Sequence, residues 1–308
     1  MDEIGAHDLS TTEEALPSII HPLHSRVVEV LDAQEPQLPL AANDQLDIKR
    51  KIDLALAAGT QLHALHHAAV VRISSDIVLK TQDGKDQTEL MALRHVQRHA
   101  QHIPVPRLLG ALAYDGKIRI FMSYIQGSSV KELWTSLLPE QKSSIRDQVA
   151  GIVADLREVP LPSHYMGCGK PPTCIDIRAS KRHSKPNVSN EAEFNDFLLS
   201  EPKSRISPTY LMFLKENCMR TDHRIVMTHG DLTPRNIIAE LSDTDVKVVG
   251  LVDWECAGAY PEYWEYVKSL NTFSSIEEDD WCWYLPHAAI GQYTEEWAKN
   301  ILIEKAIK

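Results

Sequence analysis

The most informative stretch of this sequence is Thr228-His229-Gly230-Asp231-Leu232-Thr233-Pro234-Arg235-Asn236, which is followed farther along the chain by Val252-Asp253-Trp254-Glu255. Short β-branched runs flank both segments, so Asp231 and Asn236 are expected on a loop and Asp253 at the end of a strand. This arrangement brings the three side chains to one mouth of a cleft. Phosphoryl transfer requires a carboxylate that accepts the proton of an attacking hydroxyl, and oxygen ligands that hold Mg²⁺ against nucleotide phosphates. The two segments match these requirements.

A structural alternative exists for each of these residues taken alone. Asp231 and Asn236 are residue types that form hydrogen bonds within turns, and Asp253 could cap a strand. The three together, in this order and after the elements upstream, favour the chemical interpretation.

The first half of the chain contains short strand-like runs. Ser74-Ser75 separates AAVVRI from DIVLKT, and Asp115-Gly116 separates RLLGALAY from KIRIFMSYI, so two β-hairpins are predicted. Between them, residues 86–100 carry an apolar stripe with helical spacing, which predicts a helix that ends before the prolines at 104 and 106.

After Gly127 the pattern becomes helical. Residues 145–156 have one apolar face, residues 160–190 are predicted to be a long surface loop because they are rich in Pro, Gly, Lys and Ser, and Asn190 with Glu193 resembles a capping box. Ser207-Pro208 predicts the start of a further helix. The expected domains are a partly helical N-terminal extension (1–58), a small β-rich lobe (59–125) and a larger, mostly helical lobe (126–308).

Composition and charge exclude several classes of protein. The chain has 308 residues, of which 43% are hydrophobic and 24% charged, so it is long enough and apolar enough to bury a sizeable core. Its net charge of -11 argues against a nucleic-acid or anionic-membrane partner. No apolar run reaches the length of a membrane-spanning helix, and the acidic start MDEIGAHDLSTTEEALP lacks the features of a secretory or transit peptide. A cytoplasmic protein is therefore predicted, and no pattern indicates an oligomeric state.

The cysteines and histidines do not form a metal-binding pattern. The five cysteines are widely spaced and lack a C-x-x-C pair, which predicts reduced thiols. His63, His66 and His67 cluster without a nearby Cys or carboxylate, so a helix or turn surface is favoured over a metal site.

At the level of motifs, the sequence resembles the aminoglycoside phosphotransferase / choline kinase superfamily, and within it a large fungal subgroup of kinase-like proteins. The resemblance rests on HGDLTPRNI and VDWE, with support from PEYWEYVKSL, EAEFNDFLLS, DHRIVMTHGD and IPVPRLLGA, and it extends from about residue 68 to 298. It implies an α+β, bilobal, protein-kinase-like fold that binds ATP and Mg²⁺ and phosphorylates a small-molecule acceptor.

Carried over from this resemblance, Asp231 is the expected catalytic base, and Asn236 and Asp253 are the expected Mg²⁺ ligands. Lys80 matches the family's nucleotide lysine, and Glu89 on the following helix is expected to pair with it. The alternative is that both are exposed side chains without a role, but the strand context of Lys80 and the position of Glu89 on the following helix favour the functional interpretation.

The resemblance also assigns roles around the nucleotide. Met122, Ser123 and Ile125 are expected at the hinge between the lobes, where the backbone of Ser123 and Ile125 forms the adenine-binding edge and Met122 could equally be core. Three further residues are expected to support the catalytic loop or the metal motif: His229, Arg235 and Glu255.

The leading hypothesis is therefore an ATP- and Mg²⁺-dependent phosphotransferase that acts on a hydroxyl of a small molecule. A protein Ser/Thr kinase is disfavoured, since the loop contains HGD instead of HRD and the metal motif DWE instead of DFG, and no A-P-E segment follows. A kinase-like fold reused for ligand binding or other chemistry stays open, because fold does not fix function. The acceptor is not identified. Trp264, Trp281, Trp283 and Trp297 could line an acceptor pocket, but such spacing is more typical of a core. The acidic run at 277–280 could attract a cationic acceptor, but a solvated loop is favoured.

Overall fold

The computed structural model describes residues 16–34, 44–65, 68–84, 86–178, 180–242, 245–271 and 280–307. The chain divides into two compact units, one formed by Met1–Lys85 with Leu109–Met122 and the other by Asp86–Leu108 with Ser123–Lys308. The predicted domain boundaries at residues 58 and 125 stay predictions. His66, His67 and residues 277–279 lie outside the described part of the chain.

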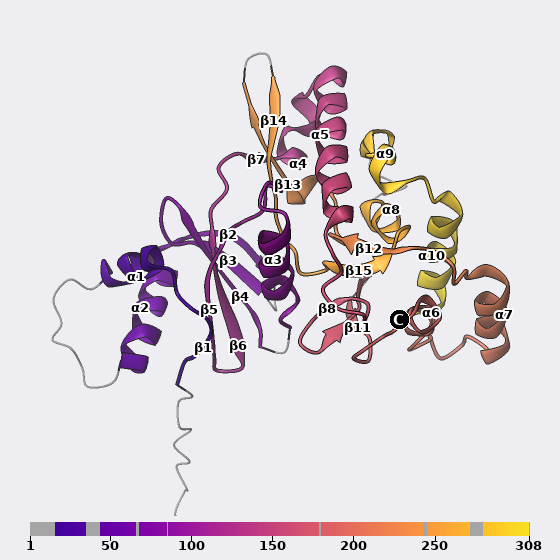
Figure 1. Cartoon of the computed structure of the whole chain (residues 1–308), viewed down its shortest axis with the longest axis horizontal. Coiled ribbons are helices and arrows are strands. Elements are labelled where there is room, and N and C mark those ends of the chain that lie inside the picture. Colours follow the sequence, from indigo (N-terminus) through magenta and orange to yellow (C-terminus); the bar gives the residue numbers. More distant parts are fainter. Residues whose placement is uncertain are drawn as a thin grey trace, which may run out of the picture. The chain divides into compact units, whose positions relative to one another are not determined.

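The smaller unit is built on a six-stranded sheet with the order β1-β5-β6-β4-β3-β2 (Figure 1). Its strands are β1 (Ser18–His21), β2 (Thr60–Leu65), β3 (Ala68–Arg72), β4 (Ile77–Asp83), β5 (Leu108–Tyr114) and β6 (Lys117–Ser123). β3 and β4 pair antiparallel on either side of the Ser74-Ser75 turn, and β5 lies next to β6. Both predicted hairpins are confirmed.

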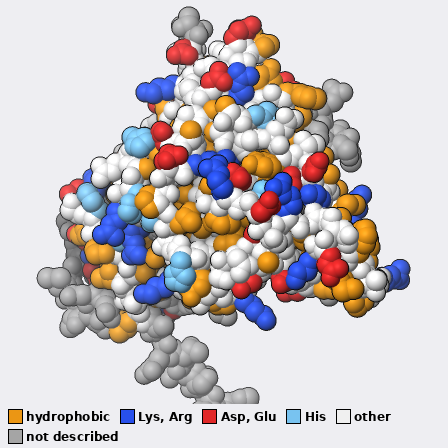
Figure 2. All heavy atoms as spheres, turned by 45° about the vertical axis from the view of Figure 1, so that its right-hand side comes forward, with side chains coloured by type: hydrophobic (Ala, Val, Ile, Leu, Met, Phe, Trp, Pro, Cys, Tyr) orange, Lys and Arg blue, Asp and Glu red, His pale blue; other side chains and the backbone are white. Residues whose placement is uncertain are grey.

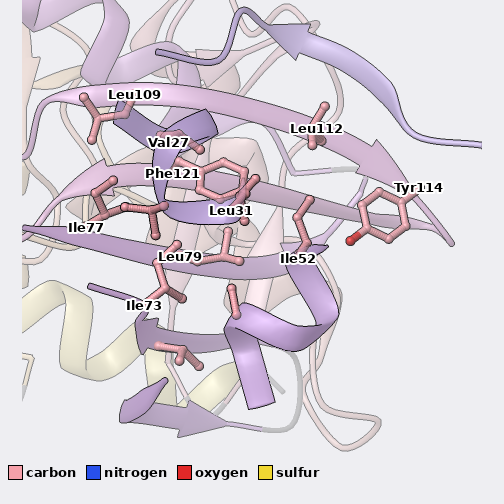
Figure 3. Close-up of a cluster of buried hydrophobic side chains, with 13 residues drawn as sticks. Val27, Leu31, Ile52, Ile73, Ile77, Leu79, Leu109, Leu112, Tyr114 and Phe121 are labelled. Atoms are coloured by element: carbon pink, nitrogen blue, oxygen red, sulfur yellow. The ribbon is translucent and has the colours of Figure 1, made fainter. Parts of the chain in front are cut away.

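Two helices, α1 (Ser25–Asp32) and α2 (Asp44–Ala58), pack on this sheet and complete its hydrophobic core. Figure 3 shows Val27, Leu31 and Ile52 of these helices facing Leu79 and Phe121 of the strands. All five side chains are buried. The helices that the sequence places in an N-terminal extension thus supply one wall of the core.

The larger unit contains most of the helices. They are α3 (Thr88–His99), α4 (Val130–Leu133), α5 (Pro139–Glu158), α6 (Glu191–Leu198), α7 (Pro208–Cys218), α8 (Trp264–Ser269), α9 (His287–Ile290) and α10 (Thr294–Ala306), with short 3₁₀ turns η1 (Trp134–Ser136), η2 (Pro234–Asn236) and η3 (Trp281–Tyr284). The longer predicted helices are confirmed. Asn190 caps α6 by accepting the Glu193 N–H, whereas the Glu193 carboxylate accepts the N–H of Ser189 instead of closing a capping box.

Short strands lie between these helices. β12 (Ile225–Thr228) pairs antiparallel with β15 (Gly258–Pro261), and β13 (Ile237–Leu241) pairs antiparallel with β14 (Val246–Leu251) and β7 (Ser128–Ser129). β12, β13 and β14 correspond to the three strand-like runs around the two motifs. The segment HGDLTPRN connects β12 to β13, as the sequence predicts.

The prediction of a surface loop at 160–190 is wrong. This segment contains β8 (Cys168–Gly169), β9 (Pro172–Thr173), β10 (Ile175–Ile177) and β11 (Lys181–His183), and Asp176 within it is fully buried. The physical reason is charge compensation: the carboxylate of Asp176 binds Lys268, Arg178 and Arg182, so polar residues typical of a loop are buried as an ion cluster.

None of the helices within the described ranges has the length and apolarity needed to cross a membrane. Figure 2 shows acidic and basic side chains lying beside one another over one face, with hydrophobic side chains between them. Such mixing is typical of the surface of a globular protein.

Candidate functional site

The loop that carries Asp231 contains a glycine, Gly230, that no other residue can replace without strain. Gly230 has φ +79°, and a Cβ at this position would lie 2.3 Å from the carbonyl oxygen of Cys256. The backbone therefore turns sharply after β12 and passes close to the segment that follows Asp253. This turn places His229 and Asp231 in the interior of the larger unit, where both are buried.

Asp231 and Asn236 lie side by side, as their spacing predicts. The Asn236 Nδ2 donates to the carbonyl oxygen of Asp231 at 2.8 Å and to its Oδ2 at 2.7 Å. Arg235 donates to both carboxylate oxygens of Asp231, at 3.2 and 2.9 Å. Since the amide nitrogen of Asn236 makes these bonds, its amide oxygen points away from the Asp231 carboxylate. The loop thus presents a held carboxylate and, beside it, an amide oxygen.

Asp253 has an unusual backbone conformation, with φ +65°. Both of its neighbours are fixed by hydrogen bonds: Val252 donates its N–H to the Asn236 carbonyl at 2.9 Å, and Trp254 donates its N–H to Glu89 Oε1 at 3.3 Å. Positive φ in a residue with a side chain costs about 1–3 kcal/mol and clusters at functional sites. Burial would lower the pKa of Arg235, but the carboxylates of Asp231 and Asp253 raise it, and Asp231 is also its hydrogen-bond partner.

His229 supports the loop from inside. The N–H of Asp231 donates to its Nδ1 at 3.3 Å, which leaves the proton on Nε2 to donate to the Val252 carbonyl at 3.0 Å. The imidazole also packs edge-on against Trp254, with ring centroids 4.7 Å apart. His229 therefore connects the Asp231 loop to the residues on both sides of Asp253.

Glu265 is a residue of the site that sequence reasoning missed. It is buried on α8, where Oε2 accepts the His229 N–H at 2.6 Å and Oε1 accepts the Gly230 N–H at 3.1 Å. Burial raises the pKa of this carboxyl, while the two N–H donors act in the opposite direction. Glu265 belongs to the stretch PEYWEYVKSL. In the sequence alone, nothing distinguishes it from an acidic residue on the exposed face of a short helix.

Glu89 and Glu255 also lie near the metal motif. Glu89 is buried on α3 and accepts the Trp254 N–H, so it contacts the residue that follows Asp253. Glu255 lies 3.4 Å from the ammonium of Lys181, which comes from β11. Lys80 lies on β4 of the smaller unit, opposite Val70, and its pairing with Glu89 stays a prediction.

The predicted hinge residues lie where β6 ends. Met122 is buried, and the Ser123 N–H donates to the Arg107 carbonyl at 2.9 Å while its Oγ accepts the Arg107 N–H at 2.8 Å. Ile125 packs against Gly250 of β14, where a Cβ would lie 2.4 Å from the Ile125 side chain. These contacts fix the positions of Ser123 and Ile125. The contact of their backbone with adenine stays a prediction.

The tryptophans divide between core and surface. Trp264 is buried in a core cluster against which Trp297 packs. Trp281 is buried and packs edge-on against Trp134, whereas 79% of Trp283 is exposed. At 280, the end of the acidic run, Asp280 accepts hydrogen bonds from Lys142 and Trp134.

The residues around Asp231 fit a magnesium ion. Mg²⁺ prefers oxygen ligands and is usually bound by one or two protein groups together with substrate phosphates and water. The carboxylate of Asp253 and the amide oxygen of Asn236 are such ligands, and the strained backbone at Asp253 is a cost that a ligand role explains. Among the residues described, His, Cys, Asp and Glu form no group of three that could hold a metal by themselves.

The fold and the loop geometry together define the kinase-like class of protein. A family model described as the phosphotransferase enzyme family matches residues 67–298, and the chain belongs to this family. The match agrees closely with the extent of the resemblance predicted from the motifs, and the aminoglycoside phosphotransferase / choline kinase superfamily is confirmed.

Similar proteins support the same assignment. Ethanolamine kinase 2 of Rattus norvegicus is 32% identical over 83 residues, which are 27% of this chain and 21% of that protein, so the match spans about a fifth of the relative's length. The GDP and kanamycin complex of APH(2")-IIia has a TM-score of 0.57 at 12% identity, with 90% of this chain and 87% of that chain covered. The GDP complex of aminoglycoside 2'-phosphotransferase-IIIa has a TM-score of 0.55 at 13% identity, with coverage of 91% and 87%. The predicted α+β, bilobal, kinase-like fold is confirmed.

Proposed function

We propose that this protein transfers the terminal phosphoryl group of ATP, in the presence of Mg²⁺, to a hydroxyl of a small molecule. The observation that carries the proposal is the hydrogen-bonded set of Asp231, Arg235 and Asn236 on one loop, fixed through His229 to the strained turn at Asp253. Membership of the phosphotransferase family supports the reaction class. The nucleotides named in the solved neighbours and the name of the ethanolamine kinase relative support a nucleotide donor and a small acceptor.

In this proposal the Asp231 carboxylate orients the acceptor hydroxyl and accepts its proton during transfer. Arg235 and Asn236 hold the carboxylate in place, so little reorganisation is needed when the hydroxyl binds. Asp253 and the amide oxygen of Asn236 would hold Mg²⁺, which when bound neutralises charge on the nucleotide phosphates. Lys80 contributes a further cation to the phosphates, and the backbone of Ser123 and Ile125 receives the adenine.

The first test separates chemistry from nucleotide binding. Purified protein is incubated with Mg²⁺, ATP and a panel of hydroxyl compounds that includes amino alcohols, aminoglycosides and neutral sugars, and ADP release is measured. With an acceptor found, Asp231→Asn is expected to lower the rate by about 10²–10⁴-fold while Mg²⁺–nucleotide affinity changes little, because general-base catalysis is lost and the metal ligands remain. Asp222→Asn, at an exposed ion pair, is the control.

A second measurement tests the metal ligand. Asp253→Ala is expected to weaken Mg²⁺–nucleotide binding in a calorimetric titration, since a carboxylate ligand to a hard cation is removed. Activity of Asp231→Asn within a few-fold of the unaltered protein would refute the role of Asp231 as the catalytic base. Unchanged nucleotide affinity of Asp253→Ala would refute the role of Asp253 as a metal ligand.

A further inference from the structure

Lys181 forms a partly buried ion bridge beside the metal motif. Its ammonium lies 2.6 Å from Asp86 Oδ2 and 3.4 Å from Glu255 Oε2, and the side chains of all three residues are at most 17% exposed. Burial alone would lower the pKa of Lys181, but the carboxylates of Asp86 and Glu255 outweigh it and raise the pKa. The same contact lowers the pKa of Asp86 in spite of burial. The pKa directions of Lys181 and Asp86 favour a charged pair, and Glu255 Oε2 lies near the same ammonium.

The partners of Lys181 belong to two functionally important segments. Asp86 uses its other carboxylate oxygen, Oδ1, to accept the N–H of Thr88 at 3.0 Å, which fixes the start of α3. Glu255 stands two residues after Asp253 in the metal motif. One cation from β11 thus joins the first turn of α3 to the turn that carries the proposed metal ligand.

The position of Asp253 depends on α3 as well. Glu89, one residue into α3, accepts the N–H of Trp254, which follows Asp253. The positive φ of Asp253 is retained only if its surroundings hold it. A shift of α3 would release the Trp254 N–H, and a shift of Glu255 would allow the turn to relax.

We propose that Lys181 is a positioning residue for the Mg²⁺–nucleotide site: by holding Asp86 and Glu255 together, it keeps α3 against the metal motif and Asp253 in its strained conformation. This inference rests on the proposed function. Groups that orient metal ligands without touching the metal are known to change metal affinity or activity by about 10–100-fold when altered. Lys181 thereby gives the segment 180–183, predicted to be part of a surface loop, a role in nucleotide binding.

The test measures binding of a non-hydrolysable ATP analogue, adenylyl imidodiphosphate, by calorimetry with and without Mg²⁺. Lys181→Met keeps the aliphatic stem and removes the charge, and it is expected to weaken Mg²⁺-dependent binding by about tenfold or more. Lys181→Arg restores a cation and is expected to recover most of the affinity. Lys299→Met is the matched control, because Lys299 is similarly shielded and pairs with Glu296 on α10.

The outcomes are distinguishable. Equal affinity of Lys181→Met and Lys299→Met overturns the positioning role while the proposed function stands. An increase in the KM for the acceptor alone also overturns it, since that result assigns Lys181 to the acceptor. Absence of Mg²⁺-dependent binding by the unaltered protein overturns the proposed function and this role with it. If Lys181→Met does not fold, Glu255→Gln removes one arm of the bridge, and a loss of Mg²⁺-dependent affinity is again the supporting result and no loss the refuting one.

Discussion

Replacement of the buried Asp176 by asparagine is expected to destabilise the larger unit strongly. The carboxylate is fully buried and lies 2.6 Å from Lys268 Nζ, 2.6 Å from Arg178 Nε and 3.2 Å from Arg182. An asparagine side chain would have the same shape without the charge, so three shielded cations would lose their common partner. Removing one side of a buried ion pair costs about 3–5 kcal/mol.

The pKa of Asp176 gives an independent magnitude. Burial acts to raise this pKa, but Lys268 and Arg178 lower it from its ordinary value of 3.8 to about 2. A difference of this size between the unfolded and folded states corresponds to about 2 kcal/mol of stability. Because the folded-state pKa is depressed, this contribution is complete above the unfolded value and is lost as the pH falls from about 4 towards 2. We therefore expect Asp176→Asn to cost about 2–5 kcal/mol at pH 7 and progressively less below pH 4.

Tryptophan fluorescence is the natural assay for this variant. The sequence has six tryptophans, and all of them lie within residues 123–308, so their emission during urea unfolding reports on the larger unit. Asp147→Asn removes an exposed partner of Arg146 and is the control, with almost no change in stability expected. A loss below about 1 kcal/mol for Asp176→Asn would refute the reasoning, since it lies below both magnitudes. The reasoning would also be refuted if the difference in the free energy of unfolding between Asp176→Asn and the unaltered protein were the same at pH 7 and at pH 3.

Three further substitutions test the catalytic loop. Gly230→Ala is expected to destabilise the larger unit by about 1–3 kcal/mol and to abolish transfer, because φ is +79° and the new Cβ would lie 2.3 Å from the Cys256 carbonyl oxygen. Urea unfolding measures the first effect and ADP release the second, and a fully active variant would contradict the geometry. Glu265→Gln leaves one of two buried N–H groups without its acceptor, so a cost of about 1–3 kcal/mol is expected, and a change near zero in the same unfolding assay would count against it. Asp253→Gly relieves the strain of a positive φ, so the free energy of unfolding is expected to rise by about 1 kcal/mol, while the Mg²⁺–nucleotide affinity measured by calorimetry falls. A variant that is less stable and has unchanged affinity would contradict the proposed role of Asp253 as a strained metal ligand.

Local patterns predict most of the fold. The hairpin at Ser74-Ser75, the strands around the catalytic loop and the cap at Asn190 depend on turn chemistry and on hydrogen bonds between near neighbours, which a sequence shows directly. The segment 160–190 could not be predicted in this way. Its polar residues are typical of a loop, and they are buried only because Lys268, far along the chain, supplies the opposite charge to Asp176.

In the candidate site, too, residues recognisable from the local sequence differ from those whose role depends on distant segments. Asp231, Asn236 and Asp253 can be identified from the sequence because the chemistry requires these residue types at the ends of strands. The structure brings Asp231 and Asn236 into hydrogen-bond contact.

Glu265 and Lys181 do not stand out in the sequence, since neither belongs to a motif and both act on the site through a neighbour. Glu265 accepts backbone N–H groups, and any sequence at those backbone positions would offer the same donors. Lys181 acts through two carboxylates that are remote from it in sequence. A motif therefore locates the groups proposed to contact substrate, whereas the groups that hold them in place become visible only when distant segments are brought together. For this chain the second set is as informative a target for mutagenesis as the first, because the strain at Asp253 persists only while its supports remain.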